Sequence, residues 1–485
     1  MTTSEQPASR KKAASLDEIF QPRGVAVVGV SPNQPGFAGV GLGFLLALKE
    51  IGHTAAYPVN PNYDEIEGLK CYASVLDIEG PVDHVISSVP APIVPKILED
   101  CIAKGVRSIQ LFTAGFSETE DEEMAELEQK IVARANEGGI RIFGPNCMGL
   151  YVPEAKLSWM SGAATEAGPV GYLSQSGGNT GEMVMISTVR GIRYSKAVSY
   201  GNAADVDESE LLEYLADDPK TEIIAAYIEG VKDGPRFVRA IRKAAAVKPV
   251  VVLKGGRTDA GTRAVKSHTA SLAGSYEVFD ALCRQVNAVH VKSVEEMADM
   301  VVAFRFMGAP TGPRIGIVGV GGGMSVFAAD EISEAGLECP ELPEHTQSEL
   351  REFIAVAGTS VRNPLDAIQV FEPNMLERTL TAVGKAENID VLVYPTGLPS
   401  IRRRSAALSS AAGPDDYVNA LVRAREASGT PIVVVVRPPL DTTGMEMAAP
   451  LQKKLWEAGF PVFATVPRAA NAIAKLLRWR ENKLD

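Results

Sequence analysis

The sequence has few of the residues that mark disulfide-rich, zinc-binding or membrane-spanning proteins. Its 485 residues include five cysteines, an odd number, and these are widely separated with no Cys-x-x-Cys pair. Neither a disulfide framework nor a zinc site is therefore expected, and no other metal site is predicted. No run of about 18 apolar residues occurs, and no apolar segment follows the basic residues near the N-terminus, so we expect no membrane span and no export signal. A reducing cytoplasm fits these features best.

Positive charge is also in short supply. The chain has 48 Lys and Arg residues against 60 Asp and Glu, which gives a formal net charge of -12 at pH 7. Without a broad basic surface to hold a phosphodiester backbone, nucleic acid is not expected as the main partner, and any anion site must be local. The hydrophobic fraction is 46% and the charged fraction 22%, as in an ordinary globular protein. A chain of this length is too long for one core, so we expect two to four domains.

Short β-branched runs separated by longer amphipathic segments recur along the chain. GVAVVGV, HVISSVP and SIQLFTAG are examples, and the pattern is typical of a parallel sheet covered by helices on both faces. It restarts at VGYLSQSGG and again at RIGIVGVGGG, and these two openings share a strand, a Gly/Ser turn and a helix start, which indicates an internal duplication. The sequence predicts an α/β protein with a flexible tail, a Rossmann-like domain and two flavodoxin-like doubly wound domains, over residues 1–14, 15–150, 160–305 and 312–480.

The first candidate site is the turn VGVSP, which contains Gly29 and Ser31 directly after the first predicted strand. A glycine in this position lets the backbone approach a phosphate at a helix N-terminus, so a nucleotide-containing ligand is predicted. The spacing is not GxGxxG, and the second strand ends in Asn60, where an NAD site usually has Asp or Glu. A dehydrogenase is therefore disfavoured. A tight turn with no ligand is the other interpretation of this segment.

The second candidate site is the turn SQSGG, with Ser176, Gly177 and Gly178 immediately before an amphipathic segment. The N–H groups at the start of that helix, together with the hydroxyls, could hold a phosphate. A serine N-cap followed by glycines for a tight turn would need no ligand. Further along, Asp207 to Glu210 precede the apolar run LLEYLA and are interpreted as a structural capping box.

The third candidate is His268, in the Gly/Ser/Thr-rich stretch KSHTASLAGS after the strand-like run VVVLK. A histidine in such a loop is not on an apolar helix face, so a core histidine is the weaker interpretation. The imidazole is mostly neutral at cytoplasmic pH and can attack phosphorus to form a covalent intermediate. Glu229 closes the run EIIAAYIEG, where a strand-end carboxylate could orient the imidazole. The alternative for Glu229 is an exposed acid with no functional role.

Taken in order, these segments resemble the α-subunit of the ADP-forming acyl-CoA synthetases, relatives of succinyl-CoA synthetase. The resemblance covers about residues 16–478. The CoA-binding domain of that family is matched by VGVSP, YPVNPNYDEIEGLKCYASV, VPAPIVP, TAGFSE and GPNCMGL. The ligase domain with its phosphorylated histidine is matched by SQSG, SYGNAADVDESELLEYLADD, YIEGVKDG and VVLKGGRTDAGTRAVKSHTASLAGS.

The resemblance implies a reaction and a role for each candidate residue. A carboxylic acid, CoA and ATP would give acyl-CoA, ADP and phosphate through an acyl phosphate and a phosphohistidine. His268 would accept the phosphoryl group with Glu229 as its carboxylate partner. The helix end that holds the phosphate would consist of Ser176, Gly177 and Gly178. The CoA site would include Gly29, Ser31, Asn60, Val89, Pro90 and Asn146.

The resemblance also implies a second subunit. No Lys-bearing ATP-grasp module follows Asp485, so Mg-ATP is expected on a separate ATP-grasp β-subunit, in an α2β2 heterotetramer. A non-catalytic CoA-binding or acyl-CoA-binding scaffold is the alternative that this absence keeps open. A Rossmann oxidoreductase is the other alternative, and it leaves the His268 segment without a use.

Two segments depart from the family pattern. The chain has GVGGGMS at 319–325 where the family has an NAGGPG-like turn, and NPLDAI at 363–368 where it has an NPVDL-like segment. Both are expected near the pocket for the acid. The usual short-chain acid is therefore not assumed for this chain.

Overall fold

The computed structural model describes residues 13–32, 39–119, 121–269, 275–319, 321–355, 359–396, 412–437 and 442–484. The side chains of residues 266–269, 442–445, 447 and 484 lie outside this description. The chain divides into two compact units, one of residues 1–185 and 193–294 and the other of residues 186–192 and 295–485. Within the described ranges, no helix is long and apolar enough to cross a membrane.

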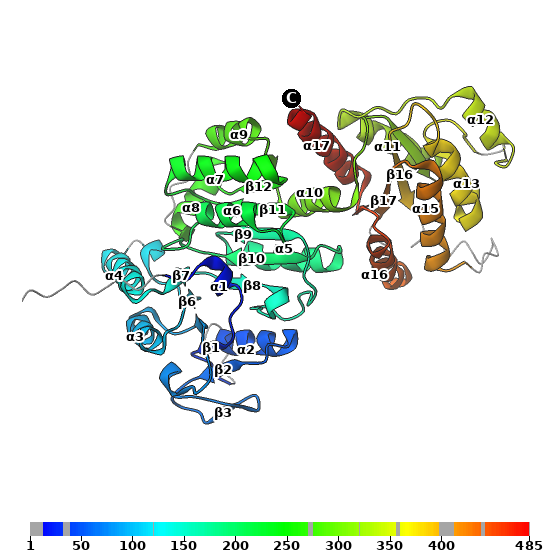
Figure 1. The fold of residues 1–485 in the computed structure, drawn as a ribbon. Helices are drawn as coiled ribbons and strands as arrows, with labels where there is room; N and C mark the ends of the chain where they lie inside the picture. Colours follow the sequence, from blue (N-terminus) through cyan, green and yellow to red (C-terminus); the bar gives the residue numbers. More distant parts are fainter. Residues whose placement is uncertain are drawn as a thin grey trace, which may run out of the picture. The chain divides into compact units, whose positions relative to one another are not determined.

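The first unit begins with a five-stranded parallel sheet in the order β2-β1-β5-β6-β7. The first strand lies inside the sheet because the chain winds outward from it in both directions, as in a Rossmann-like fold. Its strands are β1 (Val25–Val28), β2 (Ala56–Val59), β5 (His84–Ser87), β6 (Ser108–Leu111) and β7 (Arg141–Phe143). The hairpin β3 (Glu65–Ile66) and β4 (Leu69–Lys70) and the helices α1 (Leu16–Ile19), α2 (Val40–Ile51), α3 (Val94–Lys104) and α4 (Glu122–Gly138) accompany it (Figure 1).

The second sheet has the order β13-β12-β11-β9-β10-β8, and only its edge strand β8 is antiparallel. Its strands are β8 (Gly149–Tyr151), β9 (Val170–Ser174), β10 (Tyr194–Ser199), β11 (Ile223–Ile228), β12 (Val250–Lys254) and β13 (Val289–Val291). The helices are α5 (Gly177–Val189), α6 (Glu208–Asp217), α7 (Gly234–Val247), α8 (Asp259–Thr269) and α9 (Tyr276–Gln285). Without β8, the strand order is that of flavodoxin-like folds, as predicted.

The second unit contains a five-stranded parallel sheet in the order β15-β14-β16-β17-β18, again flavodoxin-like. Its strands are β14 (Ile315–Gly319), β15 (Leu365–Asp366), β16 (Val391–Thr396), β17 (Ile432–Val436) and β18 (Val462–Phe463). The helices are α10 (Val294–Phe306), α11 (Gly322–Glu334), α12 (Glu344–Arg351), α13 (Pro373–Gly384), α15 (Pro414–Ser428), α16 (Thr442–Glu457) and α17 (Val466–Leu484). Helices α13 and α15 pack together, and α11 packs against α17.

The last residues of α5 and the turn after it belong to the second unit. Arg190 is buried there, and its guanidinium lies 2.6 Å from the Asp299 carboxylate of α10. Arg468 of α17 contacts the same carboxylate at 2.6 Å. Two guanidinium groups thus share one buried carboxylate, and this ion group binds the turn to α10 and α17. A buried charge needs such partners because its transfer from water is costly.

The start of α6 agrees only in part with the predicted capping box. The Asp207 side chain accepts a hydrogen bond from the Glu210 N–H at 2.8 Å and therefore caps the helix. The Glu210 carboxylate does not return to the cap. It contacts the Arg141 guanidinium at 2.7 Å instead, because Arg141 emerges from β7 directly beside α6.

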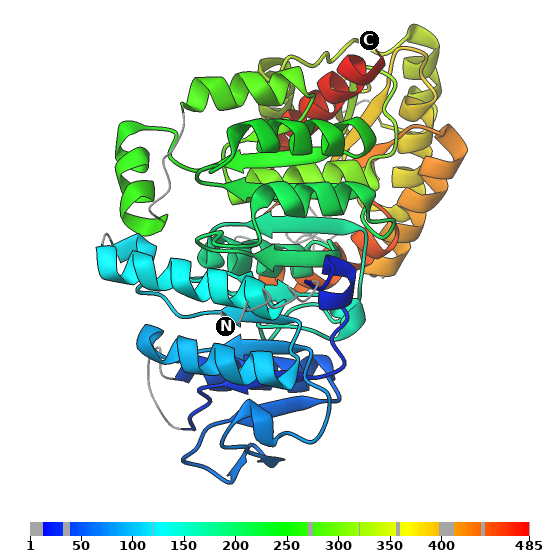
Figure 2. The same cartoon turned by 60° about the vertical axis from the view of Figure 1, so that its left-hand side comes forward.

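The two sheets of the first unit lie next to each other, the first in blue and cyan and the second in green (Figure 2). Arg141 lies at the junction between them. Its guanidinium binds both Asp205, at 3.0 Å, and Glu210, and all three side chains are largely buried. Beside it, the main chain of residues 142–145 pairs with that of residues 202–206 through several N–H to C=O hydrogen bonds. The chain then continues into β8, which extends the second sheet. Covalent continuity, hydrogen bonds and ion pairs therefore hold the two sheets together.

We predict that Arg141→Ala destabilises the first unit by about 2–4 kcal/mol, because it leaves two largely buried carboxylates without their cation. Arg134→Ala is the matched control, since Arg134 also forms a two-oxygen ion pair, with Glu99, but on the exposed surface. Its loss should cost less than about 1 kcal/mol. Denaturant unfolding followed by tryptophan fluorescence measures both, and equal effects of the two substitutions would contradict the importance of the junction.

Candidate CoA and phosphate site

The residues predicted for CoA binding all lie beyond the carboxyl ends of strands of the first sheet. They follow four of its strands, with Gly29 and Ser31 after β1, Asn60 after β2, Val89 and Pro90 after β5, and Asn146 after β7. The strand order reverses between β1 and β5, and ligands of open α/β sheets bind at this edge. The fold thus brings residues spread over more than a hundred positions of the sequence to one edge.

Gly29 follows β1 and lies against Ser88 and Val89, the residues that follow β5. Its φ is +90°, and a Cβ at this position would lie 2.9 Å from the carbonyl oxygen of Ser88 and 3.0 Å from Val89 Cγ1, so a larger residue would push the strand ends apart. A chain of hydrogen bonds continues along the edge. The Thr113 hydroxyl donates to the Val89 carbonyl at 2.7 Å, and the Asn146 N–H donates to the Thr113 carbonyl at 2.9 Å.

Asn60 is buried and binds the protein itself. Its amide nitrogen donates to the Val30 carbonyl at 2.7 Å and to Ser31 Oγ at 3.3 Å, and its amide oxygen accepts from the Asn62 N–H at 3.0 Å. These bonds join the ends of β1 and β2. Asn60 therefore fixes the shape of the sheet edge that is predicted to bind CoA, and it fixes the position of Ser31.

The turn predicted to hold phosphate connects β9 to α5. The Ser176 hydroxyl accepts from the Asn179 N–H at 3.3 Å, which makes Ser176 the N-cap of the helix. Ser174 Oγ accepts from the Ser176 N–H at 3.2 Å and donates to the Ser176 carbonyl at 2.8 Å, so the turn is held internally. The first amides of a helix have no partner within it, and here those of Gly177 and Gly178 are the donors available to an anion.

Met148 lies between the two candidate sites. A Cβ on Gly177 would come within 2.7 Å of Met148 Cγ, so the phosphate turn packs directly on this side chain. The Met148 N–H donates to Ser199 Oγ at 3.1 Å, and its carbonyl accepts from Gln110 Nε2 at 2.6 Å. Because Asn146 is only two residues away, the edge predicted for CoA and the turn predicted for phosphate are next to each other.

Glu229 follows β11 directly and is only 4% exposed, so the interpretation of an exposed strand-end acid is wrong. β11 is the neighbour of β9, which places Glu229 at the reversal point of the second sheet beside the phosphate turn. The pKa of Tyr227 is raised well above its usual value. Burial is the largest cause, and the negative charge of Glu229 is the second. The Tyr227 hydroxyl interacts with the Glu229 carboxylate and with the Asn179 side chain of α5.

The backbone of His268 lies in the last turn of α8, not in a loop as predicted. The error arose because Gly, Ser and Thr were taken as loop formers, although the segment has apolar Ala264 and Val265 at its centre, and Val265 is buried. Helix α8 lies beside the short helix of residues 117–119, which follows β6 of the first sheet. The His268 side chain and residues 270–274 lie outside the described residues.

Two buried residues beside Glu229 were missed by the sequence analysis. Gln175 is the second residue of the SQSG turn, and its side-chain oxygen accepts hydrogen bonds from main-chain N–H groups at the end of β11. Lys254 is the last residue of β12, and its ammonium donates to main-chain carbonyls at 2.7 and 2.5 Å. A charged residue at the end of an otherwise apolar strand, VVVLK, was the signal that could have identified Lys254.

The two segments of the third domain that depart from the family pattern meet around a cavity of about 500 Å³. It lies at the carboxyl edge of the third sheet, and it is lined by Gly322, Ser325, Val326, Ala329, Asp330, Thr359, Ser360, Pro364 and Asp366. The Asp366 carboxylate accepts from the Gly321 N–H at 2.6 Å and so closes the turn before α11. Within the described ranges, no group of three or more His, Cys, Asp and Glu side chains is arranged to hold a metal ion.

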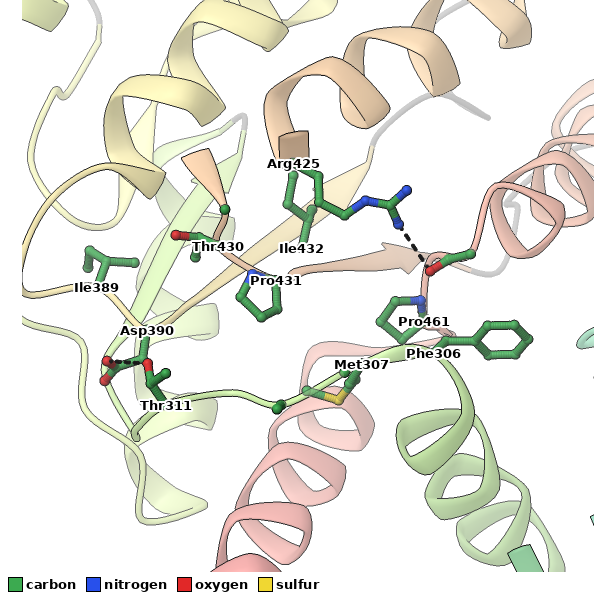
Figure 3. Close-up of a pocket in the computed structure, with 14 residues that line it drawn as sticks. Phe306, Met307, Thr311, Ile389, Asp390, Arg425, Thr430, Pro431, Ile432 and Pro461 are labelled. Carbon is green, nitrogen blue, oxygen red and sulfur yellow. Dashed lines mark hydrogen bonds between the residues drawn. The ribbon is translucent and has the colours of Figure 1, made fainter. Parts of the chain in front are cut away.

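A second cavity, of about 350 Å³, lies at the opposite edge of the third sheet, beside the segment that leads from α10 to β14 (Figure 3). Several of its polar groups are already paired. The Asp390 carboxylate accepts from the Thr311 hydroxyl at 3.1 Å, and Arg425 donates to the Gly459 carbonyl at 3.2 Å. None of the predicted site residues lines it. This edge carries the amino ends of the strands, where such sheets do not usually bind ligands.

Comparison with known proteins agrees with this arrangement. Residues 23–153 match the family described as CoA binding domain, and residues 167–304 match the succinyl-CoA ligase like flavodoxin domain. The α-subunit of ADP-forming acetate–CoA ligase II from Pyrococcus furiosus is 36% identical, over 87% of this chain and 89% of that protein. The α-subunit of ligase I from the same organism is 33% identical, over 97% of this chain and 98% of that protein.

Longer relatives and a solved structure extend the comparison. ADP-forming acetate–CoA ligase I from Archaeoglobus fulgidus is 38% identical over 78% of this chain, and the chain spans 54% of its length. An acetyl-coenzyme A synthetase from Ca. Korarchaeum cryptofilum, solved with phosphate and ADP, superposes with a TM-score of 0.78 at 29% identity and covers 97% of this chain and 98% of that one.

A CoA-binding domain followed by a succinyl-CoA-ligase-like domain defines the class of CoA ligases built on the succinyl-CoA synthetase plan. Within that class, the chain belongs to the family of ADP-forming acid–CoA ligases, and it is similar along nearly its whole length to the separate α-subunits. CoA is accordingly a substrate of this family, which supports the prediction that residues 15–150 are a CoA-binding domain.

The contact between Gly177 and Met148 gives a test of the packing. Gly177→Ala forces Met148 to move and should cost about 1–3 kcal/mol of stability. Gly178→Ala is the matched control, because the nearest atom to its new Cβ would be Ser176 Oγ at 3.9 Å. That variant should be neutral, or more stable by up to about 1 kcal/mol, since alanine is the better helix former. Thermal unfolding compares the two, and an equal loss in both variants would contradict the close contact.

Proposed function

We propose that this chain is the CoA-binding and phosphoryl-carrying subunit of an ADP-forming acid–CoA ligase. It would convert a carboxylic acid, CoA and ATP into acyl-CoA, ADP and phosphate. The observation that carries the proposal is the position of Met148, whose side chain packs on the phosphate turn while Asn146, two residues earlier, ends the edge predicted for CoA. CoA and a phosphoryl group are thus expected to bind at neighbouring places of the first unit.

His268 accepts the phosphoryl group in this proposal. A phosphoryl group from ATP forms a P–N bond with its imidazole as ADP leaves, and the acid's carboxylate then takes the group to form an acyl phosphate. The thiolate of CoA attacks the acyl carbon, the C–S bond forms and phosphate leaves. Glu229 stabilises the positive imidazolium that arises in these transfers, as an acidic partner does in hydrolase triads.

The phosphate turn would stabilise the phosphoryl group during both transfers. The amides of Gly177 and Gly178 point outward from the start of α5, where the helix dipole favours negative charge. Ser176 contributes its hydroxyl as the helix cap and so keeps those amides in position. Hydrogen bonds to charged groups contribute about 1.5–3 kcal/mol each, enough for two or three donors to change a transfer rate greatly.

The acid would bind in the 500 Å³ cavity of the third sheet. The amides at the start of α11 are the donors available to its carboxylate, while Val326, Ala329 and Pro364 surround the rest of the molecule with apolar groups. Such a lining suits an acid with an apolar body larger than that of acetate. The identity of the acid would thus be set by α11 and by residues 359–366.

The nucleotide would be bound by a second subunit with an ATP-grasp fold, which also holds Mg²⁺ on the phosphates. Similarity to separate α-subunits supports a partner chain, since the A. fulgidus relative is about twice as long as the part that this chain spans. We propose an α2β2 assembly of the two chains. Five cysteines without a disulfide among them are compatible with a cytoplasmic protein.

We predict that CoA stabilises the first unit against heat and that NAD does not. At a concentration one hundred times Kd, a ligand that binds only the folded state adds about 2.7 kcal/mol. Gly29→Ala should abolish this stabilisation because its Cβ would separate the ends of β1 and β5. Differential scanning fluorimetry with each ligand makes the measurement, and protection by NAD alone would favour an oxidoreductase.

We further predict that the chain incorporates phosphate from γ-labelled ATP only together with its ATP-grasp partner and Mg²⁺. The label should be lost in acid and kept in base, as expected for a phosphoramidate. His268→Ala should lose the label and the formation of acyl-CoA. Glu229→Gln should fold normally but accept the label more slowly, by about tenfold or more.

Ser267→Ala, beside His268, is the control for the labelling experiment and should retain both label and turnover. Normal acyl-CoA formation by His268→Ala, or a label that survives acid, would rule out the phosphohistidine. If CoA binds but no nucleotide-dependent reaction occurs with any ATP-grasp partner, the chain is a CoA-binding scaffold.

A further inference from the structure

Three neighbouring strands of the second sheet end at nearly the same level. Ser174 of β9 lies opposite Tyr227 of β11, and Ile228 of β11 lies opposite Lys254 of β12. The residue that follows β11 is Glu229. Glu229 therefore lies between Gln175, the residue after β9, and Lys254, the last residue of β12.

Gln175 binds the main chain of Glu229 from the β9 side. Its side-chain oxygen accepts a hydrogen bond from the Glu229 N–H and a second one, at 2.9 Å, from the Gly230 N–H. Its own N–H donates to the Tyr227 carbonyl at 3.2 Å, in continuation of the β9–β11 pairing. Gln175 is only 4% exposed, so these bonds are shielded from water. A residue of the phosphate turn thus holds the strand end that presents Glu229.

Lys254 binds the same strand end from the β12 side. Its ammonium donates to the Glu229 carbonyl at 2.7 Å and to the Gly255 carbonyl at 2.5 Å. The side chain is 2% exposed. Burial lowers the pKa of Lys254, and the negative charge of Glu229 opposes that change. The ammonium and the carboxylate therefore interact electrostatically, although the hydrogen bonds of Lys254 go to the main chain.

A positive charge at this position has a use that a neutral donor would not have. In the proposed function, a phosphoryl group is brought next to the Glu229 carboxylate, and like charges at short range disfavour each other. A buried ammonium that already binds the main chain of Glu229 offsets part of this repulsion without moving.

We infer that Gln175 and Lys254 are positioning residues that hold Glu229 beside the phosphate turn, and that Lys254 also compensates the charge of its carboxylate. The inference rests on the proposed function. Neither residue is required to touch CoA, the acid or the phosphoryl group. Their removal should therefore impair the phosphoryl transfer step and leave the affinity for CoA unchanged.

The test uses the full chain with radiolabelled inorganic phosphate and either acetyl-CoA or phenylacetyl-CoA, a thioester with a larger apolar body. It runs in the reverse direction of the proposed reaction, which needs no nucleotide. Phosphate displaces CoA from the acyl group to give an acyl phosphate, and His268 takes the phosphoryl group as the carboxylate of the acid leaves. Gln175→Met and Lys254→Met should each lower the rate of acid-labile labelling by about tenfold, as expected for the loss of one or two buried hydrogen bonds.

A conservative substitution separates the loss of charge from a general loss of structure. Lys254→Arg keeps the positive charge beside the Glu229 carboxylate, so it should label faster than Lys254→Met. Gln175→Met leaves the ammonium of Lys254 in place, and its affinity for CoA should be unchanged.

Lys248→Met is the matched control for Lys254→Met. Lys248 stands just before the other end of β12, and its ammonium also donates to two main-chain carbonyls, those of Leu215 and Asp218, each at 2.6 Å. Gln347→Met is the control for Gln175, because Gln347 is a buried glutamine of the second unit that donates to the Leu342 carbonyl at 2.8 Å. Both control variants should label within about twofold of the unchanged protein.

Each outcome decides the question. Labelling by Gln175→Met and Lys254→Met at the unchanged rate would overturn the inference while leaving the proposed function intact. A similar loss in Lys248→Met would show that only stability is affected, and this also overturns it. If one variant does not fold, as judged by its melting temperature and CoA affinity, the other carries the test. An unchanged protein that takes up no label with either thioester refutes the proposed function, and the inference falls with it.

Discussion

The geometry of the candidate site depends on the junction between the two sheets of the first unit. A short stretch of chain ends the first sheet with β7 and, six residues later, joins the second sheet as β8. Arg141 fixes the start of this stretch through Asp205 and Glu210, and Met148 fixes its end against the phosphate turn. The two sheets are thereby held in one orientation within the unit, with the edge predicted to bind CoA next to the turn predicted to hold phosphate.

The sequence was sufficient to predict the three sheets, because each begins with an apolar strand followed by a turn that contains glycine, and this pattern depends only on local preferences. The positions of Gly29, Ser176 and Glu229 at strand ends followed from the same pattern. Contacts between distant segments could not be predicted in this way. The Arg141 ion pairs cross 64 and 69 positions, and the bonds from Gln175 to the end of β11 cross 54 and 55. Such pairs depend on strand order, which periodicity does not reveal.

The second and third sheets show how a duplicated fold can acquire different chemistry at the same edge. Both have the strand order of a flavodoxin-like fold and a helix that begins after a glycine-rich turn. In the second sheet, the neighbouring strand β11 is followed by the buried carboxylate of Glu229, and Gln175 and Lys254 hold its main chain. In the third sheet, the turn is closed by the Asp366 carboxylate, and the adjacent cavity is largely apolar. The shared strand order of the two sheets therefore sets where a site can form, while a few side chains at the strand ends set the charge of that site.

The ion group of Arg190, Asp299 and Arg468 has a consequence for any attempt to study the domains separately. A shortened chain that stopped at residue 311, between the second and third domains predicted from the sequence, would lack Arg468 and the Val462 carbonyl, which also accepts from Arg190. Asp299 would lose one of its two cations, and the apolar face of α10 would lose the helix α17 that carries Arg468. The boundary that is easiest to see in the sequence is for this reason a poor place to divide the protein for expression or crystallisation.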